Sequence, residues 1–489
     1  MMRRGPFLSG TAAALGTGVL AGSPPAGAQP VPAVPAVPSA AATGPITDLR
    51  FGMAPVPAAR PGFDPAGDAK ALIVAGTPSP ATAPIPGRQV AGGRGDARWL
   101  LRVPDAWNGN LVVIGTPAFR SEYANDAIWG DFLLARGYAF ATSNKGIPYN
   151  AIAEPLAATP APDRIYPVPF DLAQLETKKL GYRLGALAPA KVGIASWNDD
   201  FAALTVFAKG ALPRAPARTY AVGLSNGGAQ VRSLLERRPD LVDGGVDWSG
   251  VFWSPQRSLL DYIPPFLRVM PAYVASAFTD EKAAGSIANA GFPADRRQAE
   301  PHPSLWFEYY AGQPSFYADL TLFAYALLID PEAASALAAD GCTPSEQNPV
   351  RLPGTCRGSG LRSPSERAAY VPSARARDAI RAFAHGGAIG KPLISIAGDA
   401  DVFITPQNNA KPYLDAVNAR GRGASCWQYL VQGGTHVDAF VPLGYALQAQ
   451  LPFAWAAFDQ LVGIVERGAR PAGAGTQRSV TTPAEIERS

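Results

Sequence analysis

Short apolar runs alternate with amphipathic segments along most of the chain. Apolar, β-prone residues predict strands at 71–74, 98–103, 111–114, 138–142, 219–222, 245–248, 393–397 and 426–431. Apolar spacing after Gln230 predicts a helix that stops at Pro239, and 132–137 is predicted to end another helix. Strands that alternate with helices are typical of a mostly parallel α/β sheet with helices on both faces.

The segment 251–390 interrupts this alternation. It has no comparable strand pattern and is rich in helix formers and aromatic residues. Because long loops without structure of their own are uncommon in compact domains, the segment predicts a helical cap. Most of its aromatic side chains should pack the cap, while a minority could line an apolar pocket. The aromatic residues of the segment include Trp253, Phe266, Trp306, Phe307, Tyr309, Tyr310, Phe316, Tyr317, Phe323 and Tyr325.

The N-terminal residues have the composition of an export signal. Residues 1–28 contain Arg3 and Arg4, then the apolar stretch 7–22, then Ala26-Gly27-Ala28 before Gln29. This order predicts a cleaved signal peptide and a secreted or periplasmic protein. The arginine pair leaves both general secretion and twin-arginine export open. The apolar stretch is shorter than the ~20 residues of a membrane span, so no transmembrane helix is expected.

The remaining chain divides by composition. Residues 29–46 form a Pro/Ala-rich linker, and 471–489 are expected to be a disordered tail. The α/β core then consists of 47–250 and 391–470, with the cap 251–390 between them. A net charge of +4 on 489 residues is too small and dispersed to indicate nucleic-acid binding.

The most informative segment for function is Gly223-Leu224-Ser225-Asn226-Gly227, which follows a predicted strand and opens a predicted helix. A sharp strand-to-helix turn strains the serine backbone, and small neighbours allow the strand and the helix to approach closely. The pattern predicts a nucleophile elbow that presents the Ser225 hydroxyl. An ordinary glycine-rich turn is the alternative.

A serine nucleophile needs a base, and the chain has three histidines, His302, His385 and His436. His436 follows the predicted strand 426–431, and it is the only histidine after the candidate acids described next. His302 lies between two prolines and is better explained by an exposed turn. His385 is better explained as a helix-end or surface residue.

The acid is expected just beyond the strand 393–397, where Asp399 and Asp401 lie. A buried carboxylate there would hold His436 in the correct tautomer while the imidazole takes the serine proton. Asp401 is favoured, because an apolar residue and Pro406 follow it. Asp399 stays open as the competing acid, or as an aspartate that caps the turn.

The ordered set Ser225, Asp401 and His436, each just past a predicted strand, resembles the catalytic triad of the α/β-hydrolase superfamily. The resemblance spans most of the mature chain. It implies an α/β-hydrolase fold, with a mostly parallel sheet flanked by helices and a large helical cap insertion. It also implies that Ser225 is the nucleophile, Asp401 the acid and His436 the base.

The tetrahedral intermediate of such a reaction needs oxyanion donors. The backbone N–H of Asn226 is expected to be one of them. The second should come from the loop after 111–114, which departs from the His-Gly-Gly type of many lipases and esterases. Thr116 is the expected donor and Ala118 the alternative, while Pro117 has no N–H.

The sequence around Ser225-Asn226-Gly227-Gly228, with the export signal and the cap, resembles secreted 3-hydroxybutyrate oligomer hydrolases. It is less closely similar to the tannase and feruloyl esterase group, and it lacks the Cys-x-Ser elbow associated with tannases. The resemblance implies a carboxylic ester hydrolase whose substrate is a small-molecule or oligomeric ester of a hydroxy acid or an aromatic acid.

Two other functions stay open. A serine peptidase of the prolyl-peptidase kind shares the fold and triad order, and would carry acidic residues on the cap to bind a substrate amine. The candidates are Glu308 with Asp319, and Asp280 with Glu281. A noncatalytic binding protein on a hydrolase scaffold is the other, although such a protein usually loses a triad member.

Three cysteines in an exported chain indicate pairing. Cys342 and Cys356 flank a polar, proline-rich loop that a disulfide would close. Cys426 opens a predicted core strand and is expected to be a buried free thiol. Because no His/Cys cluster has ligand spacing, neither a catalytic metal nor a cofactor is expected.

Overall fold

The chain divides into two compact units, Met1–Pro30 and Val31–Ser489, and the described residues all belong to the second unit. The computed structural model describes residues 41–46, 69–147 without 71, 75 and 96, 154–155, 180–182, 193–293 without 277, 316–330, 332–333, 350–351, 368–443 and 447–487. The predicted signal peptide, His302, Glu308 and the cysteines Cys342 and Cys356 lie outside these residues.

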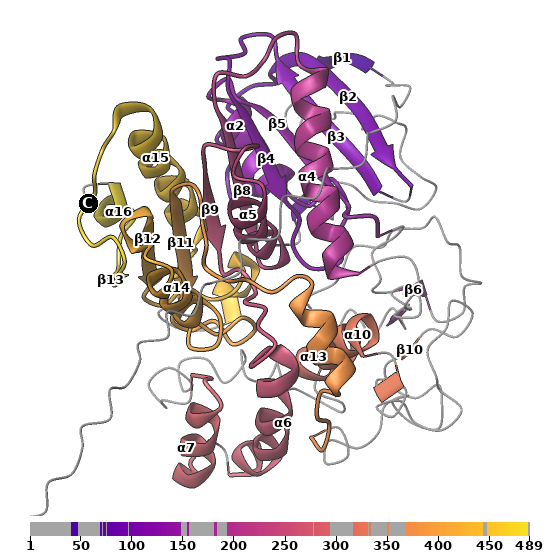
Figure 1. Ribbon diagram of the computed structural model, residues 1–489, viewed down its shortest axis with the longest axis vertical. Coiled ribbons are helices and arrows are strands. Elements are labelled where there is room, and N and C mark those ends of the chain that lie inside the picture. The colour runs from indigo at the N-terminus through magenta and orange to yellow at the C-terminus, as the bar shows by residue number, and fades with distance from the viewer. Residues whose placement is uncertain are drawn as a thin grey trace, which may run out of the picture. The chain divides into compact units, whose positions relative to one another are not determined.

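A ten-stranded sheet with the order β1-β2-β3-β5-β4-β8-β9-β11-β12-β13 forms the centre of this unit (Figure 1). Its strands are β1 (Ala41–Pro45), β2 (Pro86–Arg94), β3 (Ala97–Pro104), β4 (Leu111–Gly115), β5 (Ala139–Ser143), β8 (Thr219–Leu224), β9 (Gly244–Trp248), β11 (Leu393–Gly398), β12 (Cys426–Val431) and β13 (Gln477–Val480). The strands from β5 to β13 run parallel. The first three are antiparallel to their neighbours. The predicted mostly parallel sheet is confirmed.

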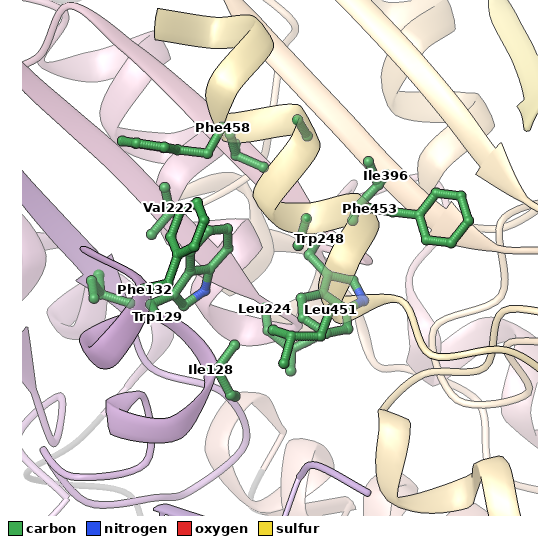
Figure 2. Packing of buried hydrophobic residues seen from close by; sticks show 14 of the residues in the cluster. Ile128, Trp129, Phe132, Val222, Leu224, Trp248, Ile396, Leu451, Phe453 and Phe458 are labelled. Carbon is green, nitrogen blue, oxygen red and sulfur yellow. The ribbon is translucent and has the colours of Figure 1, made fainter. Parts of the chain in front are cut away.

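Helices cover both faces of this sheet, because the central strands are apolar at successive positions and bury both sides. In β4, Leu111 and Val113 join a cluster with α4 (Ile194–Ala211), α5 (Asn226–Arg237) and α14 (Ala410–Ala419). Val112 and Ile114 join the opposite cluster, with a π-helical turn (Asp126–Gly130), α2 (Asp131–Leu134) and α15 (Leu451–Arg467). Figure 2 shows this second cluster, where Phe458 and Leu451 of α15 pack near Val222, Leu224 and Trp248.

The described part of 251–390, the segment predicted to form a cap, is largely helical. It contains α6 (Leu259–Ala275), α7 (Glu281–Asn289), α10 (Phe316–Ile329) and α13 (Ala374–Arg381). A short strand in the same segment, β10 (Val350–Arg351), pairs with β7 (Leu180–Tyr182), which pairs with β6 (Glu154–Pro155). Residues between β5 and α4 therefore form a small sheet with β10 of the predicted cap segment. The predicted boundary at 251 placed these residues in the α/β core.

The cap and the loops at the strand ends share one hydrophobic cluster. It joins the cap helices to Phe119 after β4, Ala229 in α5, and Val402 and Ile404 after β11. Polar contacts add to it, since Asn409 donates to the Tyr262 hydroxyl of α6 at 3.2 Å. The cap is thus packed directly against the loops that carry the candidate chemistry.

Three sequence predictions about the core are wrong. Residues 72–74 form a turn, in which Leu72 and Ile73 are buried, and the strand near this point is β2. The end of the predicted linker is β1, which pairs with β2. The predicted disordered tail 471–489 contains β13, which extends the sheet beside β12, and α16 (Ala484–Glu487). Val480 and Ile486 in that tail are fully buried.

Among the described residues, no helix has the length and apolar character that crossing a membrane requires.

Candidate active site

Ser225 occupies a strained turn between β8 and α5. Its backbone has φ 60° and ψ −119°, a region that costs a non-glycine residue about 1–3 kcal/mol. The neighbouring glycines make the turn possible, because a Cβ on Gly227 would lie 2.1 Å from the carbonyl oxygen of Gly115. A Cβ on Gly223 would lie 2.3 Å from the Gly227 backbone. The G-x-S-x-G pattern is therefore required by the close approach of β8, α5 and the loop after β4.

The backbone of Ser225 is held on both sides. Its N–H donates to the carbonyl oxygen of Trp248 at the end of β9, at 2.8 Å. Its own carbonyl accepts from the N–H groups of Ala229 in α5, at 3.0 Å, and Val251, at 3.3 Å. The residue is 7% exposed, which leaves the hydroxyl a restricted access to solvent.

Asp401 and His436 form a hydrogen-bonded pair. Because a carboxylate only accepts, His436 Nδ1–H donates to Asp401 Oδ2, at 2.8 Å. Asp401 is fully buried, and its other oxygen accepts from the N–H groups of Phe403 at 2.9 Å and Ile404 at 2.8 Å. The Phe403 ring stacks on the imidazole with 5.5 Å between centroids. These contacts fix the tautomer and leave Nε2 as the nitrogen that can accept a proton.

Asp399, the competing acid, has another partner. Its carboxylate accepts from the N–H of Gly433 at 2.8 Å, and the next residue, Ala400, donates its N–H to the carbonyl of Gly434 at 3.0 Å. Burial raises the pKa of Asp399 above its ordinary value, although the hydrogen bond from the Gly433 N–H partly opposes the change. Asp399 thus ties the acid loop to the loop before His436, and Asp401 is the carboxylate that contacts the imidazole.

The sheet order brings Ser225 to the same edge as this pair. The strands β8, β9, β11 and β12 are consecutive and parallel, so the residues that follow their carboxyl ends share one edge. No hydrogen bond joins Ser225 Oγ to His436 within the described part of the chain. In unliganded serine hydrolases this bond is often long or poorly aligned, and it tightens when substrate binds.

Asn226 begins α5, where backbone N–H groups have no partner within the helix. Its side chain is held from two sides. Oδ1 accepts from the hydroxyl of Tyr325 in the cap helix α10 at 2.7 Å, and Nδ2 donates to the carbonyl oxygen of Ala118 at 3.3 Å. The residue after Ser225 therefore links the cap to the loop that follows β4.

The predicted donor Thr116 is already engaged. Its N–H donates to Gln230 Oε1 at 3.3 Å, and its hydroxyl donates to the carbonyl of Ser143. The Thr116 N–H therefore already has a partner within the protein. The next N–H along the loop belongs to Ala118, which has φ 41° and makes no hydrogen bond through its N–H to any described residue. Ala118, the alternative in the sequence, is the better candidate.

The sequence did not single out two residues of this site. Tyr325 was one of many cap aromatics, and nothing in its spacing separated it from those that only pack the cap. The centroid of its ring lies 5.8 Å from that of Phe119 and 5.3 Å from that of Trp253. Burial raises the pKa of its hydroxyl. Lys145 was missed altogether. It follows β5 and donates to carbonyl oxygens of the loop after β4.

His385 is buried rather than at the surface. Its Nδ1 accepts from the N–H of Trp253 at 3.2 Å, and Nε2 donates to the carbonyl of Ala229 at 3.0 Å. Burial, followed by the charge of Arg232, lowers the pKa of His385 to about 3. A neutral imidazole with both nitrogens engaged has a structural role, and this excludes it as the base.

The remaining predicted groups have simpler roles. Asp280 caps α7 by accepting from the N–H groups of Lys282 and Ala283. Cys426 opens β12 as predicted, and it is a buried free thiol. The described ranges contain no group of histidine, cysteine and carboxylate side chains that could hold a metal ion.

The order of the parallel strands, the elbow between β8 and α5, and the acid and histidine after β11 and β12 together decide the architecture. The chain has the α/β-hydrolase fold. No protein-family model matches it, and no curated protein sequence does.

Solved structures with similar architecture include three hydrolases. Feruloyl esterase B from Aspergillus oryzae has a TM-score of 0.48 at 14% identity, over 82% of this chain and 86% of that one. Tannin acyl hydrolase from Aspergillus niger has a TM-score of 0.39 at 14% identity, over 83% of this chain and 88% of that one. Acylaminoacyl peptidase from Pyrococcus horikoshii has a TM-score of 0.37 at 11% identity, over 83% of this chain and 44% of that one. One fold supports many activities, so the residues of the site, rather than the fold, indicate the function.

Proposed function

We propose that this protein is a serine hydrolase that cleaves carboxylic esters through an acyl-enzyme intermediate. One observation carries the proposal, the hydrogen bond from His436 Nδ1 to the buried Asp401 carboxylate at the sheet edge where Ser225 occupies its strained turn. A hydroxyl, an imidazole and a carboxylate in this order form the arrangement that activates serine for acyl transfer.

The proposed reaction proceeds in two halves. Ser225 Oγ attacks the ester carbonyl while its proton passes to His436 Nε2, and Asp401 stabilises the imidazolium. The tetrahedral oxyanion accepts hydrogen bonds from the N–H groups of Asn226 and Ala118. Collapse breaks the bond to the alcohol oxygen, which takes the proton from His436. Water then attacks the acyl-enzyme by the same route, releases the acid and restores the Ser225 hydroxyl.

The surroundings of the site favour an apolar or aromatic group in the substrate. Three aromatic side chains lie beside Asn226 and the loop after β4, those of Phe119, Trp253 and Tyr325. The Trp197 ring packs on Phe119, with 5.9 Å between ring centroids. We propose a small-molecule or oligomeric ester of a hydroxy acid or an aromatic acid. An exported protein, secreted or periplasmic, would meet such esters outside the cytoplasm.

The peptidase alternative has less support. It needs a carboxylate that is free to bind a substrate amine, whereas Oδ1 of Asp280 accepts from two backbone N–H groups at the N-terminus of α7. A noncatalytic scaffold has less support too, because Ser225, Asp401 and His436 are all present.

Hydrolysis of p-nitrophenyl esters of short and medium acids by the mature protein and by Ser225→Ala tests the proposal. A 3-hydroxybutyrate oligomer and an ester of an aromatic acid, assayed in parallel, rank the substrate classes. Turnover that requires Ser225 supports the proposal, and folded protein that hydrolyses none of these esters contradicts it.

A further inference from the structure

Lys145 is buried directly beneath the loop that follows β4. The residue is 1% exposed and lies two positions after β5. Its ammonium donates to the carbonyl oxygens of Thr116 at 2.6 Å, Pro117 at 3.3 Å, and Ala118. Burying a lysine is unfavourable unless polar partners replace its water. Here the backbone of three consecutive loop residues replaces it.

The described partners of Lys145 suit an ammonium group. An ammonium has three N–H donors, and three carbonyl oxygens surround it. A neutral amine would have two donors and would point its lone pair at a carbonyl oxygen. The Trp197 ring, 5.1 Å from Nζ, also favours a cation at this position. These contacts favour the charged form of Lys145 under the loop.

The contacts of Lys145 fix the direction of the Ala118 N–H. In a trans peptide unit the C=O and the N–H point in opposite directions. The carbonyl of Pro117 and the N–H of Ala118 belong to the same unit, so an ammonium that binds the carbonyl turns the N–H away from itself. The carbonyl of Ala118 belongs to the next peptide unit, and it accepts from Lys145 and from Asn226 Nδ2, so the two units that flank Ala118 lie beside the elbow.

Both partners hold backbone conformations that need outside support. Ala118 has φ 41° and Lys145 has φ 61°, values that few non-glycine residues adopt. The Lys145 backbone is anchored, since its N–H donates to Ser143 Oγ at 2.8 Å, and Ser143 Oγ donates to the buried carboxylate of Asp200. Asp200 accepts in turn from Trp99 Nε1 at 2.8 Å. Strained residues that the surroundings hold in place are typical of functional sites.

We propose that Lys145 is a positioning residue that aims the Ala118 N–H at the oxyanion formed on Ser225. Its ammonium holds the Thr116, Pro117 and Ala118 carbonyls on one side, so that the loop presents the N–H on the other side before substrate arrives. Its charge also adds a fixed positive potential next to the developing negative charge. This inference rests on the proposed serine hydrolase function and adds a residue that the triad pattern does not include.

The test compares Lys145→Met, which keeps the length and apolar stem but has no donors, with Lys145→Gln, which keeps two. Removal of one oxyanion donor lowers kcat by about 100-fold or more, so we expect Lys145→Met to lose about 100-fold in kcat with KM within threefold. Lys145→Gln should be intermediate. Lys411→Met is the matched control, because Lys411 is exposed and paired with Asp415 on α14, and its kcat should not change.

A second measurement separates oxyanion stabilisation from general loss of structure. Phenylboronic acid forms a tetrahedral adduct with an active serine and places a charged or hydroxylated oxygen at the oxyanion position. Its inhibition constant should weaken in Lys145→Met by a factor close to the loss in kcat/KM. Thermal unfolding and circular dichroism of each variant establish that it is folded.

The two proposals fail differently. If Ser225→Ala hydrolyses the ester as well as the parent protein does, the serine hydrolase function is wrong. If Ser225→Ala is inactive but Lys145→Met keeps kcat within threefold, only the role of Lys145 is overturned. The same conclusion holds if the loss appears in KM alone, or if neither Lys145 variant folds, since the ammonium would then serve substrate binding or folding.

Discussion

The hydroxyl of Tyr325, on the cap helix α10, donates a 2.7 Å hydrogen bond to Asn226 Oδ1, on the residue that follows the candidate nucleophile. The cap therefore reaches the elbow through a buried polar contact as well as through apolar packing. Asn226 also contacts the proposed oxyanion loop, because its Nδ2 donates to the carbonyl of Ala118. A substitution in the cap at Tyr325 should consequently change the position of Asn226 and Ala118 at the site.

Tyr325→Phe removes the donor and leaves Asn226 Oδ1 buried without it. We expect a loss of about 1–3 kcal/mol in the free energy of unfolding, because an unsatisfied buried acceptor keeps its desolvation cost. We also expect a lower kcat, since the Asn226 side chain no longer holds Ala118. Urea unfolding and ester hydrolysis measure the two effects.

Tyr429→Phe is the matched control for Tyr325→Phe. Tyr429 is a buried tyrosine of β12 whose hydroxyl bonds Gln460 of α15, and it belongs to the cluster that includes α15 rather than to the cluster of the cap. It should lose similar stability with unchanged kcat. Equal losses of kcat in the two variants would show that Tyr325 acts only through stability.

Asp401→Asn and Asp399→Asn separate the two candidate acids. An asparagine at 401 can donate to His436 Nδ1 and so favour the wrong tautomer, and the corresponding change in a serine protease lowers kcat by about 10⁴-fold. Asp399 binds the Gly433 N–H instead, so Asp399→Asn should keep most of the activity. Ester hydrolysis at saturating substrate distinguishes them, and the reverse ranking would assign the acid to Asp399.

Gly227→Ala tests the close approach at the elbow. The added Cβ would lie 2.1 Å from the Gly115 carbonyl oxygen, which is backbone and can move only with the loop after β4. We expect both lower stability and loss of ester hydrolysis. Gly210→Ala, in α4, is the control, because its Cβ meets nothing within 4 Å and alanine favours a helix by about 1 kcal/mol. Unchanged activity in Gly227→Ala would contradict the elbow geometry.

The buried His385 should make the fold sensitive to acid. Its pKa is about 3 in the folded chain and 6.5 in the unfolded one, so between these values the unfolded state binds the extra proton. The stability it contributes is present above pH 6.5 and is lost as pH falls towards 3, at up to about 1.4 kcal/mol per pH unit.

His385→Asn tests this pH dependence. Since other carboxylates also titrate in this range, the difference between the parent protein and the variant is the relevant quantity. Urea unfolding at several pH values between 4 and 7 should show a shallower slope in His385→Asn. Equal slopes would mean that His385 takes up its proton in the folded protein as readily as in the unfolded one.

Much of the central sheet could be predicted because its strands are short apolar runs between turns. Those predicted at 111–114, 219–222 and 426–431 match β4, β8 and β12 within two residues. β2 was missed because its sequence, PGRQVAGGR, is rich in glycine and has one branched apolar residue. The residues around Leu72 are apolar because they are buried in a turn, which a local pattern cannot separate from a strand.

The candidate site was predictable where chain order and local strain carry information. Ser225, Asp401 and His436 each follow a strand, and Gly223 and Gly227 mark the turn. The oxyanion loop was not predictable in the same way. Thr116 is engaged by Gln230, which is 114 positions away, and Lys145 is brought under the loop by the pairing of β4 with β5. Such tertiary contacts leave no local pattern.

Ser225 is the proposed nucleophile of an ester hydrolase. The most direct test is the initial rate of p-nitrophenol release from p-nitrophenyl butyrate by the mature protein and by Ser225→Ala, with circular dichroism to confirm that both are folded. We expect hydrolysis by the parent protein and, in the variant, a loss of about 10⁶-fold that reaches the background of the assay. Equal rates in the two proteins, or no turnover by the folded parent protein, would contradict it.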